Sequence, residues 1–320
     1  MAKIIVEICQ NHNGDRNLLR DLIYAAKENG ADIVKGQIMF SEDLTHRKRF
    51  DEGITENGDT KTIKRPYNFE VNRLGALDLK EEDYIYFVEE SQKIDITPMM
   101  AIFSRKRIPF AASLPWKERL IKVASCDCAS YKMIDELADC FDNLIVSTGA
   151  SLDEEILKTA EMLKNKKKQF SFLHCVTNYP NGLEMANLAR MEWLRRFTPS
   201  AGWSDHTLVK RDGIKASKVA IMLGADYIER HFTILPADKT KDGPVSITPN
   251  LLKELSEFSR LTQKEQKEIV EKTIPEWQTM LGRAKRQLTH AELLNRDYYR
   301  GRFASFVNGK WIYNWEEDEI

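Results

Sequence analysis

The sequence predicts a (β/α)8 barrel, an α/β fold of the TIM-barrel type, with a short C-terminal hairpin extension. Eight short apolar runs alternate with amphipathic helical patterns over about 270 residues, which is the size and order of such a barrel. Polar residues follow the C-terminal ends of nearly all these runs, where barrel enzymes carry their chemistry. The alternative is a doubly wound open sheet, but the sequence shows no glycine-rich phosphate loop to mark one.

The expected strands are short runs rich in aliphatic residues. In chain order they cover residues 3–9, 32–37, 97–103, 120–125, 144–149, 170–176, 200–205 and 226–232. Helical patterns between them include residues 18–30, 152–166 and 209–224. Two helix-to-strand joins nearly repeat, because Gly-Ala-Asp leads into a strand at 30–32 and again at 224–226. We interpret the repeat as one supersecondary unit used twice.

Two parts of the chain are expected, a catalytic barrel over residues 1–275 and a short extension over 276–320. In the extension, Asn308-Gly309 separates two alternating aromatic runs, a strong local signal for a β-hairpin. The connection over residues 38–80 is long and charged. A connection of that length inside a compact domain usually forms a lid or a partner-binding segment.

Composition excludes several classes of function. The chain is 42% hydrophobic and 30% charged, with a net charge of −1, so no overall basic field favours nucleic acid or an anionic membrane. No apolar run approaches the roughly 20 residues that cross a bilayer. The N-terminal run has no signal-peptide cleavage site. We therefore expect a cytoplasmic protein with neither nucleic acid nor membrane as a partner.

Five cysteines are an odd number in a long chain, which argues against a secreted disulfide framework. Cys126 and Cys128 are spaced wrongly for a zinc knuckle, and no second pair accompanies them. Buried thiols in a reducing compartment are the favoured interpretation.

The polar residues at the expected strand ends form one set. They are Glu7, Lys35, Gln37, Lys122, Ser125, Asp127, Ser147, Thr148, His174, Thr177, Asn178, Tyr179, Ser204, Asp205, His206, Glu229, Arg230 and His231. Taken singly, most have a structural explanation, such as an ion pair or a hydrogen bond in the core. Their joint placement at one end of a barrel predicts a binding site.

The chemistry of this set suits a metal and an anion. Two neutral imidazoles on adjacent strands, His206 and His231, suit a divalent metal of the manganese, iron or zinc type. The lysines and hydroxyls are donors that a phosphate or carboxylate needs. In the last strand, alternation puts Glu229 and His231 on one face, which we expect to be the interior, and Arg230 towards the helices.

Six ordered motifs give the sequence a family resemblance. The stretches EICQNHNGD, GADIVKGQ, IVSTGA, LHCVTNYP, SDHTL and IERHFT resemble the N-acetylneuraminate (sialic acid) synthase family across nearly the whole barrel. The resemblance implies condensation of phosphoenolpyruvate with an open-chain amino-sugar aldehyde, such as N-acetylmannosamine or a diacetamido hexose. The products would be a 2-keto-3-deoxy sugar acid and phosphate, released by C–O cleavage.

The resemblance also implies roles for particular residues. His206 and His231 would hold a divalent metal, Mn²⁺ by preference with Mg²⁺ or Co²⁺ as alternatives, and this metal would polarise the aldehyde. Glu7 would orient water or carry protons. Phosphoenolpyruvate contacts are expected at Lys122, Ser125, Ser147, Thr177 and Ser204. Sugar contacts are expected at Lys35, Gln37, Asp127 and Tyr179.

Three departures from the family pattern lie within the expected barrel. Ala101 and Ile102 stand where the family often has Thr-Pro, which removes a hydroxyl donor. Asp127 replaces a glutamate and is one methylene shorter. Val245 stands where many members carry a sugar-binding aspartate, a contact that Asp242 would have to supply.

The fourth departure is that the extension is too short for the family's antifreeze-like domain, which in many members brings an arginine to a dimer partner's sugar. Arg296, Arg300 or Arg302 could take this role. The favoured interpretation is a hairpin that caps the barrel or pairs it in a homodimer.

Two other functions remain open from sequence. A Schiff-base aldolase would use Lys122 or Lys35 as its nucleophile. A degenerate barrel would bind or assemble without catalysis.

Overall fold

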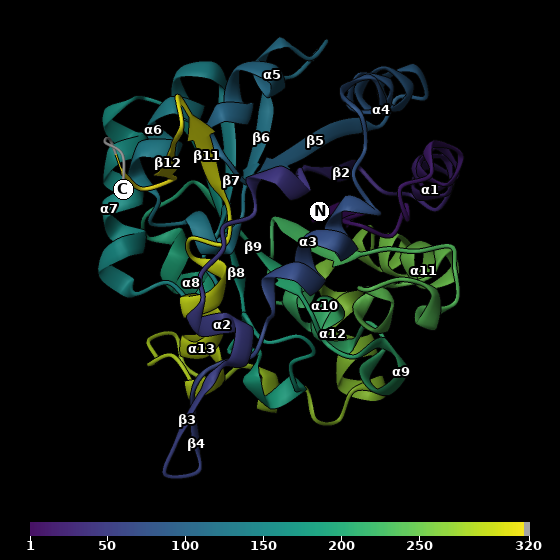
Figure 1. Ribbon diagram of the computed structural model, residues 1–320. Helices are drawn as coiled ribbons and strands as arrows, with labels where there is room; N and C mark the ends of the chain where they lie inside the picture. The colour runs from purple at the N-terminus through teal and green to yellow at the C-terminus, as the bar shows by residue number, and fades with distance from the viewer. Residues whose placement is uncertain (317–320) are drawn as a thin grey trace.

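The computed structural model describes residues 1–316, and its centre is a closed barrel of eight parallel strands (Figure 1). The barrel closes where β1 pairs with both β2 and β10. The strands are β1 (Lys3–Glu7), β2 (Ile33–Ile38), β5 (Thr97–Ile102), β6 (Leu120–Val123), β7 (Asn143–Ser147), β8 (Gln169–Cys175), β9 (Ser200–Asp205) and β10 (Tyr227–His231). The eight expected runs are these eight strands, so the predicted fold class is confirmed.

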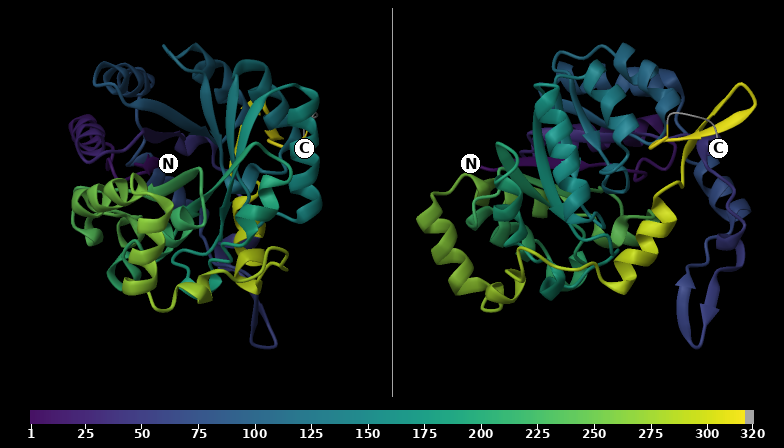
Figure 2. Two further views of the ribbon diagram at one scale, coloured as in Figure 1. Left: turned by 180° about the vertical axis from the view of Figure 1, so that it is seen from behind. Right: turned by 90° about the vertical axis from the view of Figure 1, so that its left-hand side faces the viewer.

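Helices surround the barrel as an outer ring (Figure 2). They are α1 (Arg16–Glu28), α4 (Glu81–Lys93), α5 (Ile108–Ser113), α6 (Tyr131–Cys140), α7 (Asp153–Asn165), α8 (Arg190–Arg195), α9 (Val209–Asp212), α10 (Lys215–Met222), α11 (Pro249–Ser259) and α12 (Gln263–Thr273). The single helix expected over 209–224 is in fact two. Gly213 has φ +56°, a left-handed conformation that ends one right-handed helix before the next begins.

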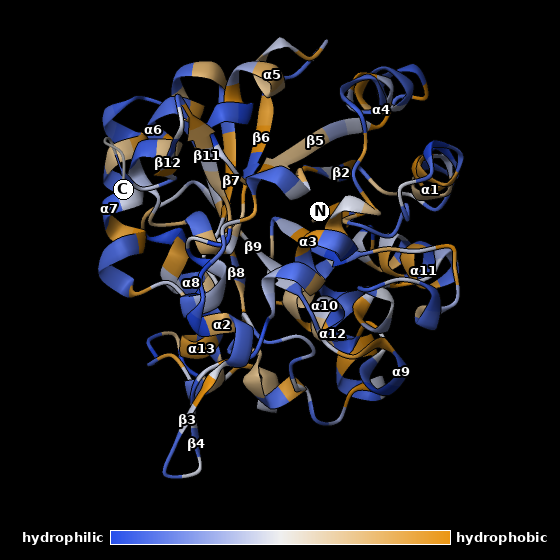
Figure 3. Ribbon diagram, in the orientation of Figure 1, coloured by the Kyte–Doolittle hydropathy of each residue, from blue (hydrophilic) through white to orange (hydrophobic). Residues whose placement is uncertain are grey.

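Helix α1 shows how the sequence builds this ring. Asp15 caps its N-terminus, because the carboxylate accepts hydrogen bonds from the backbone N–H groups of Asn17 and Leu18. Its buried residues follow helical spacing and pack in the layer between strands and helices; they are Leu19, Leu22, Ile23 and Ala26. The exposed face is polar, as Figure 3 shows for the outer helices generally.

The barrel interior is layered. A small apolar cluster fills it, formed by Ile5, Ile33, Met99, Leu120, Ile145 and Leu173. Because side chains alternate along a strand, the residue two positions later points into the same interior. On four strands that later residue is polar, namely Glu7, Lys35, Lys122 and Ser147. The apolar layer therefore forms the floor beneath a polar layer at the C-terminal ends of the strands.

Two further segments lie together at the end of the barrel opposite the N-terminus (Figure 2, right). The 38–80 connection folds as α2 (Arg49–Glu52), the hairpin of β3 (Ile54–Glu56) and β4 (Asp59–Thr62), and α3 (Tyr67–Gly75). The C-terminal segment folds as α13 (His290–Tyr299), β11 (Ala304–Val307) and β12 (Lys310–Tyr313). The Thr45 hydroxyl donates to the Gly301 carbonyl over 2.6 Å, which ties one segment to the other.

The C-terminal hairpin is confirmed, with Asn308 and Gly309 at φ 51° and 84° in its turn. Just after β12, Asn314 Nδ2 donates to Asp127 Oδ1 and to the Phe103 carbonyl, each over 3.0 Å, and so fixes the hairpin to the barrel. The domain division at residue 275 and the pairing of two copies stay predictions. No helix within residues 1–316 is both long enough and apolar enough to span a bilayer.

Candidate active site

A cavity of about 340 Å³ opens over the C-terminal ends of the barrel strands. Its walls come from the strands, the 38–80 segment and the C-terminal segment. Most of the predicted site residues line it, namely Glu7, Lys35, Gln37, Lys122, Ser125, Ser147, Thr177, Tyr179, Ser204, His206, Glu229, His231 and Asp242. Side chains from most of the barrel strands are thereby brought to one place.

A buried charge network forms the floor of the cavity. Lys35 Nζ contacts Glu7 Oε2 and lies 2.9 Å from Glu229 Oε2. Lys122 Nζ lies 3.9 Å from the same Glu229 oxygen. The Ser204 hydroxyl donates to Glu229 Oε1 over 2.8 Å, and Gln37 Nε2 donates to Glu7 Oε2 over 3.3 Å. Two ammonium groups and two carboxylates therefore balance one another away from water.

The two lysines differ in their electrostatics. Burial alone would lower the pKa of Lys35, but the carboxylates of Glu229 and Glu7 outweigh it and hold that pKa above its usual value. At Lys122 burial prevails over the attraction of Glu229, and the pKa is lowered. Burial alone would raise the pKa of Glu229. The charges of Lys122 and Lys35 outweigh burial, so this pKa is lowered. An anion bound beside Lys122 would raise the pKa of that lysine again, because it would stabilise the ammonium form.

Hydroxyl groups surround Lys122. Its Nζ donates to Ser147 Oγ over 2.6 Å and to the Val123 carbonyl over 3.1 Å, which leaves one ammonium hydrogen for a ligand. Thr177 Oγ1 is buried with no hydrogen-bond partner among the described residues. Gly149 lies so close that a Cβ there would come within 2.4 Å of Thr177 Oγ1. This corner of the cavity can receive a phosphate or a carboxylate.

The two histidines meet at one side of the mouth. Their ring centroids are 5.4 Å apart, and the ring of Tyr179 lies 4.4 Å from that of His206. Burial, aided by His231, lowers the pKa of His206 to about 3, so His206 is neutral. In both histidines Nδ1 is buried without a hydrogen-bond partner among residues 1–316. Two adjacent imidazoles with unpaired nitrogens fit a divalent metal.

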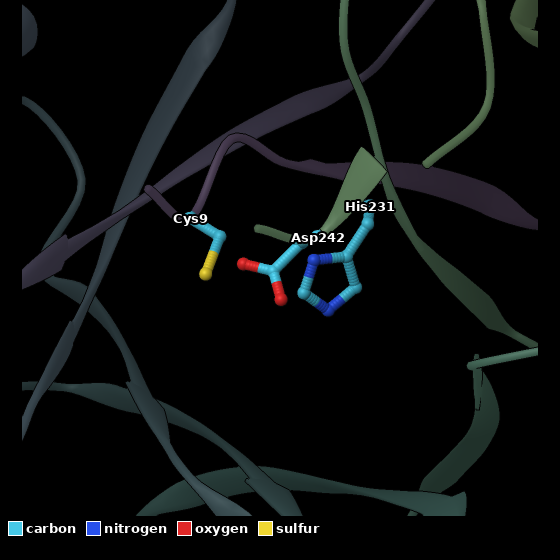
Figure 4. Close-up of side chains that lie close together, drawn as sticks. All are labelled: Cys9, His231 and Asp242. Carbon is cyan, nitrogen blue, oxygen red and sulfur yellow. The ribbon is translucent and has the colours of Figure 1, made fainter. Parts of the chain in front are cut away.

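Two neighbours of His231 add further donor atoms. The Cys9 thiol, the Asp242 carboxylate and His231 each offer one donor atom, and these three atoms all lie within 4.8 Å of one another (Figure 4). Burial, with Asp242 and Glu7 nearby, raises the pKa of the Cys9 thiol well above its usual value. Sequence reasoning missed Cys9 because it was interpreted as one of several buried thiols.

The outer wall of the cavity is rich in arginine. Glu70 Oε2 accepts from Arg302 over 2.9 Å and from Arg73 over 3.1 Å. Arg65 also lines the cavity, beside Tyr298 and Tyr299. Sequence reasoning missed Arg65 and Arg73, although the 38–80 connection that carries them was expected to form a lid or a partner-binding segment.

Only one of the three tail arginines lines this main cavity. Arg302 does so, whereas Arg296 and Arg300 contact Glu155 of α7 over 2.5 and 3.3 Å. The extension therefore caps the barrel and also contributes a cation to the cavity from within the same chain.

Some predicted polar residues lie outside the cavity lining. Asp127 Oδ1 accepts from Ser130 Oγ over 2.7 Å and from Asn314. His174 bonds through Nε2 to the Ala186 carbonyl over 2.8 Å. Both side chains are therefore held by hydrogen bonds outside the cavity lining.

The fold and the cavity define the class: a (β/α)8-barrel enzyme with a charged site at the C-terminal ends of its strands. Residues 22–271 match the sequence profile of the NeuB family. The chain therefore belongs to the NeuB family, and the resemblance predicted from its motifs is confirmed.

Similar proteins agree with this membership. N,N'-diacetyllegionaminic acid synthase of Legionella pneumophila is 33% identical over 266 residues, 80% of this chain and 71% of that protein. Pseudaminic acid synthase of Helicobacter pylori is 28% identical over 258 residues, 80% and 72% of the two chains. The crystal structure of N-acetylneuraminic acid (sialic acid) synthetase from Leptospira borgpetersenii, in complex with citrate, superposes with a TM-score of 0.69 at 26% identity. It covers 93% of this chain and 90% of that one. This chain is thus an enzyme of the sialic acid synthase type.

Proposed function

We propose that the enzyme condenses phosphoenolpyruvate with an open-chain amino-sugar aldehyde, forming a 2-keto-3-deoxy sugar acid and inorganic phosphate. The observation that carries the proposal is the buried corner around Lys122. There an ammonium group with a spare hydrogen faces the cavity beside Ser147, in a site whose hydroxyls include an unpartnered Thr177 Oγ1. A doubly anionic substrate supplies what these donors lack.

Phosphoenolpyruvate would bind with its anionic groups on Lys122, Ser125, Ser147, Thr177 and Ser204. Its negative charge would favour the ammonium form of Lys122, whose pKa burial has lowered. The surrounding strands exclude water from the floor, so the substrate's charge meets preorganised donors.

The carboxylates are held in fixed places. Lys35 contacts both Glu7 and Glu229, and the backbone N–H of Cys9 donates to Glu7 Oε1 over 2.7 Å. Glu7 is therefore oriented from several sides and keeps its place while it positions the water that adds at C2 of the substrate. Glu229 contacts Ser204 and both lysines, and so fixes these side chains relative to one another.

A divalent metal would be held by His206 and His231. When bound, it supplies Lewis-acid polarisation of the aldehyde oxygen. Both rings are available for this role, since burial keeps His206 neutral and their Nδ1 atoms have no partner among the described residues.

The sugar would lie towards the mouth, near Tyr179, Gln37, Asp242 and Arg302, with Lys35 beneath it. The relatives named as legionaminic and pseudaminic acid synthases support a diacetamido hexose, and N-acetylmannosamine is the alternative. Asp127 would act on the sugar through its neighbours, because Ser130 and Asn314 occupy its carboxylate.

Phosphate release tests this proposal. The full chain is incubated with a divalent metal, phosphoenolpyruvate and each member of a panel of N-acetyl and diacetamido sugar aldehydes. Phosphate release is measured, and the product masses are determined by mass spectrometry. One aldehyde should give phosphate and a product heavier by pyruvate. Absence of phosphate release with the whole panel would contradict the proposal.

A Schiff-base aldolase is the second candidate, favoured by the lowered pKa of Lys122. Borohydride reduction in the presence of pyruvate would leave a stable adduct on Lys122 in that case. Phosphate release without an adduct supports the first candidate.

A further inference from the structure

Three chemically different donors meet in the wall of the cavity. Cys9 lies in the loop after β1, His231 ends β10, and Asp242 lies in the loop that follows β10. Their donor atoms all lie within 4.8 Å of one another, and the Asp242 carboxylate lies between the thiol and the imidazole (Figure 4). Elements distant in sequence therefore bring sulfur, nitrogen and oxygen to one point.

The Cys9 thiol interacts with the Asp242 carboxylate, whereas the His231 ring lacks such a partner in the described part of the chain. His231 is only 9% exposed, and its Nδ1 has no hydrogen-bond partner among residues 1–316. Within the same residues, no lysine, arginine or histidine forms an ion pair with Asp242. A buried nitrogen without a partner costs free energy, and a cation shared with the neighbouring Asp242 carboxylate would remove that cost.

The spacing is close to that of a metal site. Around a tetrahedral metal with bonds of about 2.0–2.3 Å, donor atoms are about 3.5 Å apart. The three donor atoms, all within 4.8 Å of one another, would have to approach by at most about 1.3 Å to reach this spacing. His206, whose ring centroid is 5.4 Å from that of His231, stands next to the group and can provide a fourth donor.

We propose that Cys9 and Asp242 are ligands of the same metal as His231, so that the ion has a thiolate in its coordination sphere. This inference rests on the proposed function for the metal's role in the reaction. A thiolate ligand favours borderline-soft ions, Zn²⁺, Fe²⁺ or Co²⁺, over Mn²⁺ and Mg²⁺. It therefore changes the expected metal from the Mn²⁺ that the family resemblance implies.

The backbone supplies a discriminating variant. Cys9 has φ 51°, in the left-handed region that glycine adopts without strain. A Cys9→Gly change therefore removes the thiol while it relieves the backbone. If Cys9 were only a packing residue, this change would leave metal binding untouched.

Cobalt titration of the metal-free full chain tests the proposal. Wild type should develop an intense near-ultraviolet sulfur-to-cobalt charge-transfer band. Cys9→Gly should lose the band and bind Co²⁺ at least about tenfold more weakly, with an unchanged or higher Tm in the metal-free state. Asp242→Asn should weaken binding but keep the band. Cys126→Ser is the matched control, because Cys126 lines the same cavity outside the cluster, and it should keep both.

Three results would overturn the proposal: a band that persists in Cys9→Gly, cobalt binding to wild type without the band, or no cobalt binding. Phosphate release is scored separately. Turnover with Mn²⁺ but no sulfur band would retain the proposed function and reject the thiolate ligand. A sulfur band with no turnover on any aldehyde would do the reverse.

Discussion

Asp205 and Arg230 form an ion pair that is wholly buried behind the candidate metal site, with Nη1 2.6 Å from Oδ2. The two residues are register partners on neighbouring strands β9 and β10. Each immediately precedes a candidate metal ligand, His206 or His231. Because side chains alternate, the pair fixes the two strands on the helix side while the histidines project into the cavity.

Breaking this pair should destabilise the fold. Arg230→Met leaves the Asp205 carboxylate buried and uncompensated, which costs about 3–5 kcal/mol of unfolding free energy. Urea unfolding measures the change. Arg20→Met is the control, because Arg20 and Asp21 are both about half-exposed in their ion pair, and it should change the unfolding free energy much less than Arg230→Met does. Equal changes in unfolding free energy for the two substitutions would contradict the larger contribution expected from the buried pair.

Lys122→Ala should impair phosphoenolpyruvate use. Removal of the ammonium group takes away a charge-assisted donor and leaves Ser147 without its partner. We expect kcat/KM for phosphoenolpyruvate to fall by at least about a hundredfold, with the KM for the aldehyde little changed. Steady-state phosphate release measures both constants. Lys164→Ala, on the exposed face of α7, should be silent, and similar losses for both substrates would refute the assignment.

A comparison of Arg302 with Arg300 tests whether the arginine in the outer wall contributes to sugar binding. Arg302 lines the cavity and contacts Glu70, whereas Arg300 contacts Glu155 outside its lining. Arg302→Ala should raise the KM for the sugar aldehyde roughly tenfold or more, because one charged hydrogen bond is lost. Arg300→Ala should leave that KM unchanged. The idea fails if the two variants have the same aldehyde kinetics.

The metal-free protein should lose stability in acid because of His206. Its pKa of about 3 lies below the usual 6.5, so between these values the unfolded state binds more protons than the folded state. The stability contributed by neutral His206 is complete above about pH 6.5 and is lost as pH falls towards 3. His206→Gln should flatten the dependence by up to about 1.4 kcal/mol per pH unit.

Urea unfolding between pH 4 and 7, with chelator present, measures this slope. A His206→Gln slope equal to that of wild type would contradict the assignment.

Local pattern was enough to predict the barrel. Each strand is a short aliphatic run covered on both faces, a pattern that needs no long-range information. Glu7, Lys35 and Lys122 were also accessible to sequence reasoning, because polar residues at strand ends of an expected barrel share one mouth. The orientation of Arg230 followed from alternation alone, and its ion pair with Asp205 confirms that orientation.

The rest of the wall could not be predicted in this way. Arg65 and Tyr299 reach the cavity only because two irregular segments, more than 200 residues apart, pack on each other. The local sequence around Arg65 and Tyr299 does not indicate that these two segments pack on each other. Asp127 was expected to touch the sugar, but its engagement with Asn314 depends on where the hairpin packs. Cys9 became a candidate ligand only because the fold places it beside His231 and Asp242.

The origin of the cavity wall has a consequence for biosynthesis. Strand β1 finds its partner β10 only when residues 227–231 have left the ribosome, and the wall residues of 298–303 follow later still. Domains fold as their chains emerge, so the barrel can close before its mouth is complete. During that interval the charged floor is open to water, and the sugar aldehyde lacks the wall residues that we propose to hold it. Stabilisation of this enzyme by a bound sugar is therefore confined to chains that have been synthesised beyond residues 298–303.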